Sequence, residues 1–258
     1  MNSFYEQDNF QSATHKPFLK IWYPENGMYK IAAVKTIANR RAQQLPGSFY
    51  FPLKSRYKRV AKRCFDLAVS IILIPLLLSW MIPLFAILIK LDSGGPVFFF
   101  QNRNKNGGKL FSCIKFRTMT INAEADMLIA KVNDCRITMV GKFLRRFHLD
   151  ELPQLFNVLM GDMSIIGPRP YMVNENLYYE DLLESYSRRH LVKPGITGLA
   201  QSSGYFGPVH GLKRVKERFE LDIQYINNWS LAMDLKILGR TLRMIYASKR
   251  QQGQGLNT

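Results

Sequence analysis

The chain has 258 residues, enough for one domain or two small ones with a substantial core. Its net charge of +17 favours anionic partners: nucleic acid, an anionic membrane surface or phosphorylated substrates. The three scattered cysteines show neither a disulfide framework nor metal-binding spacing, and a hydrophobic content of 47% means that any membrane attachment is local.

Residues 1–55 form an N-terminal extension to which the sequence assigns no function. Residues 1–16 are polar and lack the apolar core of a secretory signal. Prolines and glycines interrupt the rest of the extension. A short basic helix is predicted over Met28–Ala42.

Residues 56–92 combine a basic collar with a long apolar run, Leu67–Ile89. A membrane-spanning helix needs about 20 apolar residues, so a full crossing is possible, and a buried core helix is the less favoured alternative. Basic residues mark the cytoplasmic side of a membrane, and they flank this run on both sides. Because Pro75 and Pro83 also interrupt it, we expect a segment that enters the membrane and returns, with a single crossing as the alternative.

Two short strands, Val97–Arg103 and Lys109–Arg117, are predicted to form a hairpin around the turn Asn106–Gly108. Lys115 and Arg117 lie two residues apart and so share one face of a strand. This face is either a solvated basic surface or a clamp for a diphosphate.

Further elements follow toward the C-terminus. We predict a helix over Ala123–Lys131, a basic segment over 138–149, a helical stretch over 172–189, a loop over Ile196–Gly204 and a helix over Leu212–Ile226. The last helix carries one apolar stripe: Leu231, Leu235, Leu238, Leu242 and Ile245. Such a stripe usually packs in a core, but the cations beside it also suit a helix lying in a membrane interface.

The most informative stretch runs from His148 to Pro170. Its apolar residues Leu152, Leu155, Phe156 and Leu159 follow the spacing of a helix with one buried face. This helix is predicted to start close to Asp150 and to stop at Gly161, which places Asp150 and Glu151 at its N-terminus. Farther on, Arg169 lies between two prolines, and a guanidinium on a stiff loop suits phosphate binding. Taken singly, Asp150 is an ordinary N-cap and Arg169 a turn residue.

In combination, these residues resemble the signature of the bacterial sugar transferases, the small monotopic phosphoglycosyl transferases. The resemblance rests on Leu149–Leu155, Gly161–Ser164 and Gly167–Pro170, and on five further blocks in the order of the family: Lys62–Asp66, Gly95–Phe99, Lys115–Met119, Lys193–Gly198 and Asn228–Leu231. It covers roughly residues 58–246. The chain departs from the family at Ser79, which Trp80 follows in place of the usual proline.

The resemblance implies an α+β fold that is mostly helical. It implies a monotopic membrane protein with a re-entrant N-terminal membrane helix, a small β-hairpin and amphipathic interfacial helices. The expected domains are the extension 1–55, the collar and membrane helix 56–92, a cytoplasmic catalytic domain 93–250 and a polar tail 251–258. The expected location is the cytoplasmic face of the bacterial inner membrane.

The resemblance also implies the reaction. A sugar-1-phosphate moves from a UDP-sugar to a polyprenyl phosphate such as undecaprenyl phosphate, with release of UMP, as the first membrane step of polysaccharide or glycoconjugate assembly. Asp150 is the implied nucleophile and Glu151 its partner, and both carboxylates are expected to bind Mg²⁺. The residues implied at the substrate are Arg145, Arg169, Lys115 and Arg117 for phosphate, and Pro194, Gly195, Thr197 and Gln201 for the nucleotide sugar.

Two other classes of function compete with this reading. A non-catalytic, basic protein anchored to the membrane explains the charge and the apolar run, but it gives Asp150, Glu151 and Arg169 no shared role. Nucleic-acid binding rests on net charge alone, because no recognisable nucleic-acid motif is present. We therefore expect membrane lipids and no nucleic acid among the partners.

Overall fold

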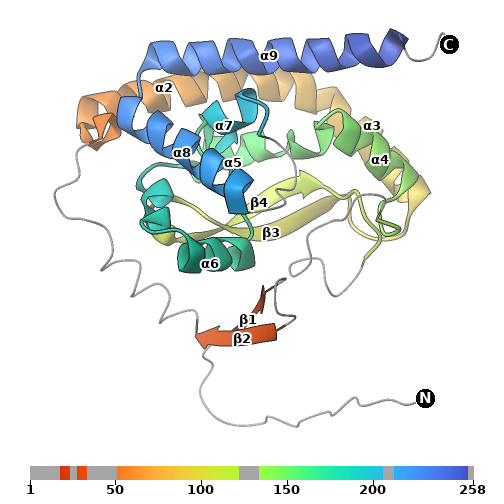
Figure 1. Cartoon of the computed structure of the whole chain (residues 1–258). Helices are drawn as coiled ribbons and strands as arrows, with labels where there is room; N and C mark the ends of the chain where they lie inside the picture. The colour runs from red at the N-terminus through yellow and green to blue at the C-terminus, as the bar shows by residue number, and fades with distance from the viewer. Residues whose placement is uncertain (1–17, 24–27, 34–50, 122–133, 206–211, 255–258) are drawn as a thin grey trace.

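The computed structural model describes residues 18–23, 28–33, 51–121, 134–205 and 212–254 (Figure 1). Its α-helices are α2 (Arg56–Leu73), α3 (Ser79–Asp92), α4 (Met139–Arg146), α5 (Gln154–Met160), α6 (Val173–Leu182), α7 (Leu199–Ser202), α8 (Leu212–Asn228) and α9 (Leu231–Gln254). Its strands are β1 (Phe18–Tyr23), β2 (Met28–Ala33), β3 (Phe98–Asn104), β4 (Leu110–Phe116), β5 (Ser164–Ile166) and β6 (Gly195–Thr197). Most of the described chain is therefore helical, as predicted.

The strands of the described residues form three separate two-stranded sheets. β1 pairs with β2 and β3 pairs with β4, both antiparallel, whereas the short strands β5 and β6 are parallel. The predicted hairpin is confirmed: a turn at Asn106–Gly108 joins β3 to β4, and Phe98 faces Phe116 at its open end.

The basic collar and the apolar run form one continuous helical stretch, Arg56–Asp92. A π-helical segment, Ile74–Leu78, joins α2 to α3, and Pro75 lies inside it. Proline removes an intrahelical donor and crowds the preceding turn, which accounts for the local widening. Figure 1 shows the chain changing direction as it passes into α3. Among the described residues, this is the one helical stretch long and apolar enough to cross a membrane.

One face of α3 is buried against the rest of the protein. Met81, Phe85 and Ile89 form a core cluster with Phe116 of β4 and Leu144 of α4. The opposite faces of α2 and α3 are exposed and apolar, and include Ile71, Ile72, Leu76, Trp80, Leu84, Ile87, Leu88 and Leu91. The apolar run thus packs against the globular part along one side and is exposed along the other.

A buried polar network ties α2 to the C-terminal helices. The Lys62 ammonium lies 2.7 Å from a carboxylate oxygen of Asp234 and 3.3 Å from one of Asp66. Asp66 in turn accepts hydrogen bonds from the hydroxyl of Ser164 and the main-chain N–H of Ile165. Because an unpaired buried charge is costly, this network fixes α2 to both β5 and α9.

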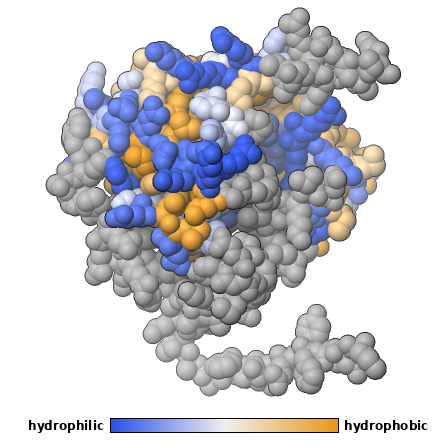
Figure 2. Space-filling view, in the orientation of Figure 1, coloured by the Kyte–Doolittle hydropathy of each residue, from blue (hydrophilic) through white to orange (hydrophobic). Residues whose placement is uncertain are grey.

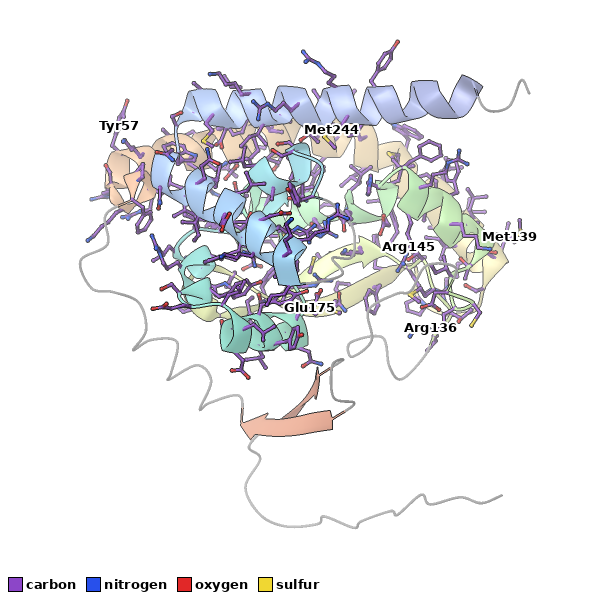
Figure 3. All side chains as sticks on the ribbon, viewed as in Figure 1. Tyr57, Arg136, Met139, Arg145, Glu175 and Met244 are labelled. Atoms are coloured by element: carbon purple, nitrogen blue, oxygen red, sulfur yellow. The ribbon has the colours of Figure 1, made fainter. Side chains whose placement is uncertain are left out.

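The apolar stripe predicted on the last helix points mostly outward. Asp234 and Ile237 form the buried face of α9, whereas Leu231, Leu235, Leu242 and Ile245 are exposed. Figure 2 shows hydrophilic residues along much of the edge where α9 lies, and hydrophobic ones both at the end where α3 and α4 lie and in the middle of the visible face. Tyr57 and Met139 also point outward in Figure 3, from the start of α2 and of α4. The outward stripe favours the interfacial interpretation over core packing.

Three predicted elements need correction. The helix expected over Met28–Ala42 is wrong over its first six residues, which form strand β2 and pair with β1. The stretch 172–189 is not one helix: α6 ends at Leu182, and a separate 3₁₀ helix follows at Tyr186–Leu191. The loop expected over Ile196–Gly204 instead contains α7 and most of β6.

Other predicted elements are confirmed or lie outside the described chain. The helix Leu212–Ile226 is confirmed as α8, and Gly161 ends α5 in a left-handed conformation with φ of 92°. Glycine adopts this conformation without the clash that a Cβ would cause. The helix expected over Ala123–Lys131 falls outside the described residues.

Candidate active site

The site is assembled where α5 packs against β4. The Asn157 side chain of α5 accepts a hydrogen bond from the N–H of Ile114 and donates one to the carbonyl of Ser112. This amide thus pairs with β4 as a neighbouring strand would. It holds the start of α5 beside the end of β4, where Lys115 lies.

Asp150 and Glu151 lie in a 3₁₀ turn, Leu149–Glu151, just before α5. The prediction that the helix starts close to Asp150 therefore holds within one turn, although α5 itself begins at Gln154. His148 precedes the turn in a left-handed conformation with φ of 54°. This backbone reversal separates α4 from the turn and sets the direction in which the two carboxylates emerge.

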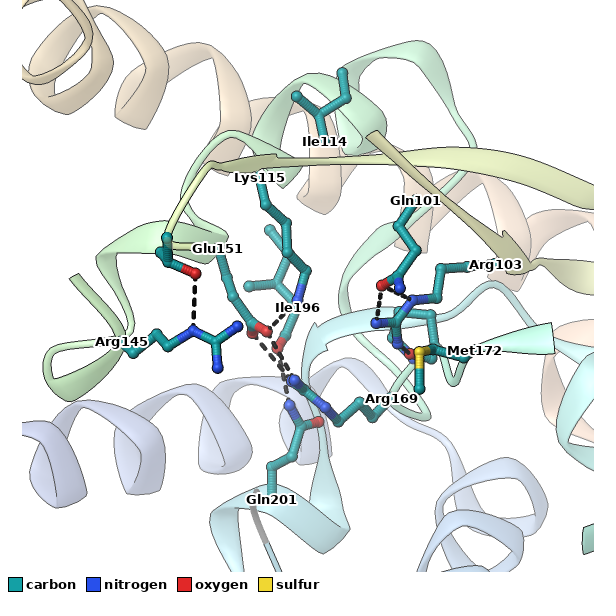
Figure 4. Close-up of polar contacts among 12 residues, drawn as sticks. Gln101, Arg103, Ile114, Lys115, Arg145, Glu151, Arg169, Met172, Ile196 and Gln201 are labelled. Carbon is teal, nitrogen blue, oxygen red and sulfur yellow. Dashed lines mark hydrogen bonds and ion pairs between the residues drawn. The ribbon is translucent and has the colours of Figure 1, made fainter. Parts of the chain in front are cut away.

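Glu151 is the centre of an ion-pair cluster (Figure 4). Its two carboxylate oxygens accept hydrogen bonds from both terminal nitrogens of Arg169, at 3.0 and 2.7 Å. The Lys115 ammonium donates to the same carboxylate at 2.7 Å. Burial by itself raises the pKa of the Glu151 carboxyl, but Arg169 and Lys115 together hold that pKa well below its usual range. Glu151 is therefore a permanent anion that orients two cations.

Asp150 is in a different electrostatic position from its neighbour. Its side chain is only 8% exposed, and burial together with the adjacent Glu151 charge raises the pKa of the Asp150 carboxyl, against the effect of Lys115, Arg145 and His148. Among the described residues, none donates a hydrogen bond to its carboxylate. Asp150 is thus a desolvated carboxylate surrounded by cations, which are the conditions that make a carboxylate a good nucleophile.

Arg145 extends from α4 toward Glu151, as Figure 4 shows, and lies close enough to Asp150 to lower the pKa of its carboxyl. Its Nε donates to the hydroxyl of Thr118 at 2.8 Å. The contact depends on Gly141, because a Cβ there would lie 2.0 Å from the Thr118 carbonyl oxygen and would push α4 away. Arg145 thus keeps its terminal nitrogens on the side of the molecule where Asp150 lies.

Arg117 does not join this cluster. Two residues that are two apart in a strand share one face, but β4 ends at Phe116. Lys115 therefore lies in the strand, whereas Arg117 lies just beyond it. The Arg117 guanidinium is buried and donates to the main-chain carbonyls of Ser93 and Gly94, just after α3. The contacts observed for Arg117 thus hold the end of α3, while Lys115 alone reaches Glu151.

Residues 194–201, which were predicted to border the nucleotide sugar, pair with the chain that leads into Arg169. Main-chain hydrogen bonds link Gly195 to Pro168 and Thr197 to Gly167. Gly195 has to be a glycine here, because a Cβ would lie 2.1 Å from the main-chain nitrogen of Gly167. Pro194 accepts a hydrogen bond from the N–H of Ser164 through its carbonyl. The segment therefore supports the loop that carries Arg169.

The polar side chains of the same segment are engaged within the protein. The Gln201 side chain donates to the carbonyl of Ile196 at 2.9 Å, and the Thr197 hydroxyl lies 2.8 Å from that of Thr241 on α9. Contact of Gln201 or Thr197 with a nucleotide sugar stays a prediction.

The carboxylates offer a limited set of metal ligands. Within the described residues, no group of three or more His, Cys, Asp or Glu side chains could hold a metal ion. Mg²⁺ commonly takes only one or two protein carboxylates and completes its coordination with water and substrate phosphate. Two adjacent oxygen-donor side chains, Asp150 and Glu151, fit that requirement.

Sequence reasoning missed two arginines next to the site. Arg103 of β3 donates to the carbonyl of Pro170, and Arg189 donates to the carbonyl of Arg169. Both are at least 92% buried. In a chain with 36 Lys and Arg residues, nothing in the local sequence separates these two from the solvated ones.

The raised pKa of Asp150 leads to a prediction about stability. An acid whose pKa is higher in the folded state costs stability once it ionises, so the cost is absent below the unfolded pKa and grows as the pH rises through the folded one. Asp150→Asn should therefore have a higher Tm than the wild type at pH 7, and the difference should vanish near pH 4. Thermal unfolding in detergent at several pH values measures this, and an Asn variant that is less stable at pH 7 would contradict it.

The chain matches a family model described as bacterial sugar transferase over residues 57–248. It is 47% identical over 184 residues to a UDP-glucose:undecaprenyl-phosphate glucose-1-phosphate transferase from Klebsiella pneumoniae, covering 71% of this chain and 39% of that protein. A protein with the same name from Escherichia coli strain K12 is 41% identical over 219 residues, covering 83% of this chain and 47% of that protein. One from Caulobacter vibrioides is 42% identical over 182 residues, covering 70% and 68% of the two chains. The chain thus spans less than half the length of the first two of these relatives.

Proposed function

Because the chain belongs to the bacterial sugar transferase family, we propose that it transfers a sugar-1-phosphate from a UDP-sugar to undecaprenyl phosphate or a similar polyprenyl phosphate. The products are a polyprenyl-diphosphate sugar and UMP. The observation that carries the proposal is the site itself: an ionisable, desolvated Asp150 beside an anionic Glu151 that holds Lys115 and Arg169 in place.

The first chemical step forms a covalent intermediate. A carboxylate oxygen of Asp150 attacks the phosphorus nearest the sugar, and the bond from that phosphorus to the oxygen bridging the two phosphates breaks. That oxygen leaves with its electron pair as part of UMP. In the second step, an oxygen of the polyprenyl phosphate attacks the same phosphorus and the Asp150 carboxylate is released unchanged.

The cations make the approach of an anionic carboxylate to an anionic diphosphate possible. Each terminal nitrogen of Arg169 keeps a second N–H beyond its bond to Glu151, and these N–H groups can donate to phosphoryl oxygens, while Lys115 and Arg145 add positive charge. Asp150, together with the lone pairs that Arg169 and Lys115 leave free on Glu151, would hold Mg²⁺, which when bound would neutralise further charge of the diphosphate. The separate roles of the two carboxylates follow from their contacts, because Glu151 is paired with Arg169 and Lys115 whereas these cations donate no hydrogen bond to Asp150.

The assay that tests this function is UMP release in detergent. The purified protein is incubated with Mg²⁺, undecaprenyl phosphate and each member of a panel of UDP-sugars, including UDP-glucose. We expect UMP with at least one of them. Without undecaprenyl phosphate, the amount of UMP should not exceed one molecule per enzyme, whereas with the lipid it should exceed that amount many times. A folded preparation that binds the substrates but releases no UMP with any member would instead support a non-catalytic, membrane-anchored binding protein.

We further propose that Arg56–Asp92 enters one leaflet and returns, with the catalytic part on the cytoplasmic face of the inner membrane. Both ends of this stretch are attached to the same globular part: Lys62 and Asp66 pair with residues of β5 and α9, and Met81, Phe85 and Ile89 pack on β4 and α4. A helix crossing the bilayer would carry one end away from that globular part. The outward apolar stripe of α9, with its neighbouring cations, suits the membrane interface.

This arrangement predicts that Ser55 and Asn106 face the same side. Single cysteines at either position, in a background lacking Cys64, Cys113 and Cys135, should both resist a membrane-impermeant thiol reagent in intact cells and react after lysis. Both positions are exposed on the protein surface, so protection would come from the membrane. Labelling of the Ser55 position before lysis would establish a single crossing.

A further inference from the structure

The loop that carries Arg169 has few ways to be held by its own backbone. Pro168 and Pro170 lack N–H groups, so the loop is anchored largely through carbonyl oxygens. The Pro168 carbonyl accepts a hydrogen bond from the N–H of Gly195 at 3.0 Å. The next two carbonyls, of Arg169 and Pro170, accept from side chains instead.

Both of those side chains are buried arginines. Arg189, which is 4% exposed, donates its Nη2 to the Arg169 carbonyl at 2.9 Å. Arg103, on β3, donates to the carbonyl of Pro170. The two come from different elements, so the loop is tied at adjacent residues to both the hairpin and the 3₁₀ helix that follows α6. A buried carbonyl without a partner is costly, so these bonds set the path of the loop.

The Arg189 guanidinium is held by hydrogen bonds from all three of its nitrogens and by contact with an aromatic ring. Its Nε donates to a carboxylate oxygen of Asp222 on α8 at 2.8 Å, and its Nη1 donates to the Tyr186 hydroxyl at 2.9 Å. It also lies 4.4 Å above the ring of Tyr171. A planar guanidinium carries its donors on three separate nitrogens and so reaches these three acceptors at once, whereas the three donors of a lysine ammonium are all on one nitrogen.

We propose that Arg189, oriented by Asp222, is a positioning residue that sets the location of the Arg169 guanidinium for phosphate transfer. It lies behind the loop and acts only through the main chain of Arg169. The inference rests on the proposed function, in which Arg169 binds the phosphoryl oxygens. Removing the Arg189 bond frees the carbonyl of Arg169 and lets the loop relax away from Glu151 and the substrate.

The test is a double-mutant cycle on UMP release. Arg189→Lys should lower kcat/KM by about 10- to 100-fold, the size of effect expected when a catalytic group is displaced by about an ångström. If Arg189 acts only through Arg169, the variant carrying both Arg189→Lys and Arg169→Lys should lose no more activity than Arg169→Lys alone. Independent effects would instead multiply. Wild-type turnover in the same assay tests the proposed function separately.

Arg218 provides the matched control. It is as deeply buried, at 2% exposed, and lies 5.4 Å from the ring of the same Tyr171, and its Nε donates to the Tyr205 carbonyl at 2.9 Å. Arg218→Lys makes the same chemical change beside the same Tyr171 ring but leaves the bond from Arg189 to the Arg169 carbonyl in place, so kcat/KM should stay within about threefold of the wild type. Should Arg189→Lys fail to fold, Asp222→Asn takes its place in the cycle, because it loosens Arg189 without removing it. Wild-type activity in the folded Arg189 or Asp222 variant, or a fully multiplicative double variant, would overturn the proposal.

Discussion

Replacing Asp150 with asparagine should abolish turnover while leaving the fold intact. The amide cannot attack phosphorus, so UMP release should fall by about 10³-fold or more, as it does when other enzymes lose a nucleophile. The fold should survive because no described residue donates a hydrogen bond to the carboxylate. UMP release and far-UV circular dichroism on the same preparation measure both effects.

Two controls sharpen this experiment. Asp181→Asn removes a carboxylate from the exposed surface of α6 and should keep full activity. Mass spectrometry of the intact Asp150→Asn protein must exclude deamidation back to aspartate, since a small active fraction would mimic residual catalysis. A pure variant that turns over at a near-normal rate would rule out the covalent mechanism.

Arg169→Lys should cost about 10²-fold in kcat/KM with little change in Tm, a loss typical of removing one preorganised donor from a transition-state site. The lysine keeps the positive charge that Glu151 needs, so the buried carboxylate stays paired. It loses the two parallel bonds, at 3.0 and 2.7 Å, that fix the fork in the plane of its partner. The steady-state kinetics of UMP release measure the loss.

Arg146→Lys is the corresponding control, because it makes the same chemical change at an exposed position on α4, directly after Arg145. Its activity should match the wild type. If Arg169→Lys were equally active, the fork geometry would have no catalytic role, and Arg169 would serve only to pair with Glu151.

The sequence was informative where a local pattern determines the structure. The alternation and turn residues of the hairpin, the Gly161 stop and the helices α8 and α9 all follow from spacing that neighbouring residues impose. The two strands β1 and β2 were missed because Met28–Ala33 carries no alternating pattern, and its pairing with Phe18–Tyr23 is what makes it a strand. The outward orientation of the α9 stripe also depends on tertiary packing, since Asp234 lies inside through its bonds to Lys62, Tyr225 and Trp229.

Some features of the site can likewise be predicted from the local sequence, and others depend on tertiary packing. The adjacency of Asp150 and Glu151, and the stiffness around Arg169, can be read from a short stretch of chain. That Glu151 rather than Asp150 receives Lys115 and Arg169 could not be predicted, because it depends on how Asn157 docks α5 against β4. Arg117 illustrates the opposite case: its spacing from Lys115 suggested a shared clamp, but the end of β4 sends the two side chains to different partners.

The buried network around Lys62 bears on how this protein can be produced and divided. Asp66, on the helix that begins the apolar run, accepts hydrogen bonds from Ser164 and Ile165, in the strand that leads into the Arg169 loop. Deleting residues up to Asp92 to obtain a soluble enzyme would take away the carboxylate that accepts from those donors and the Lys62 ammonium that neutralises Asp234. The apolar helix is therefore an internal part of the catalytic scaffold, so a truncated version should come out of expression as aggregated or unfolded chain.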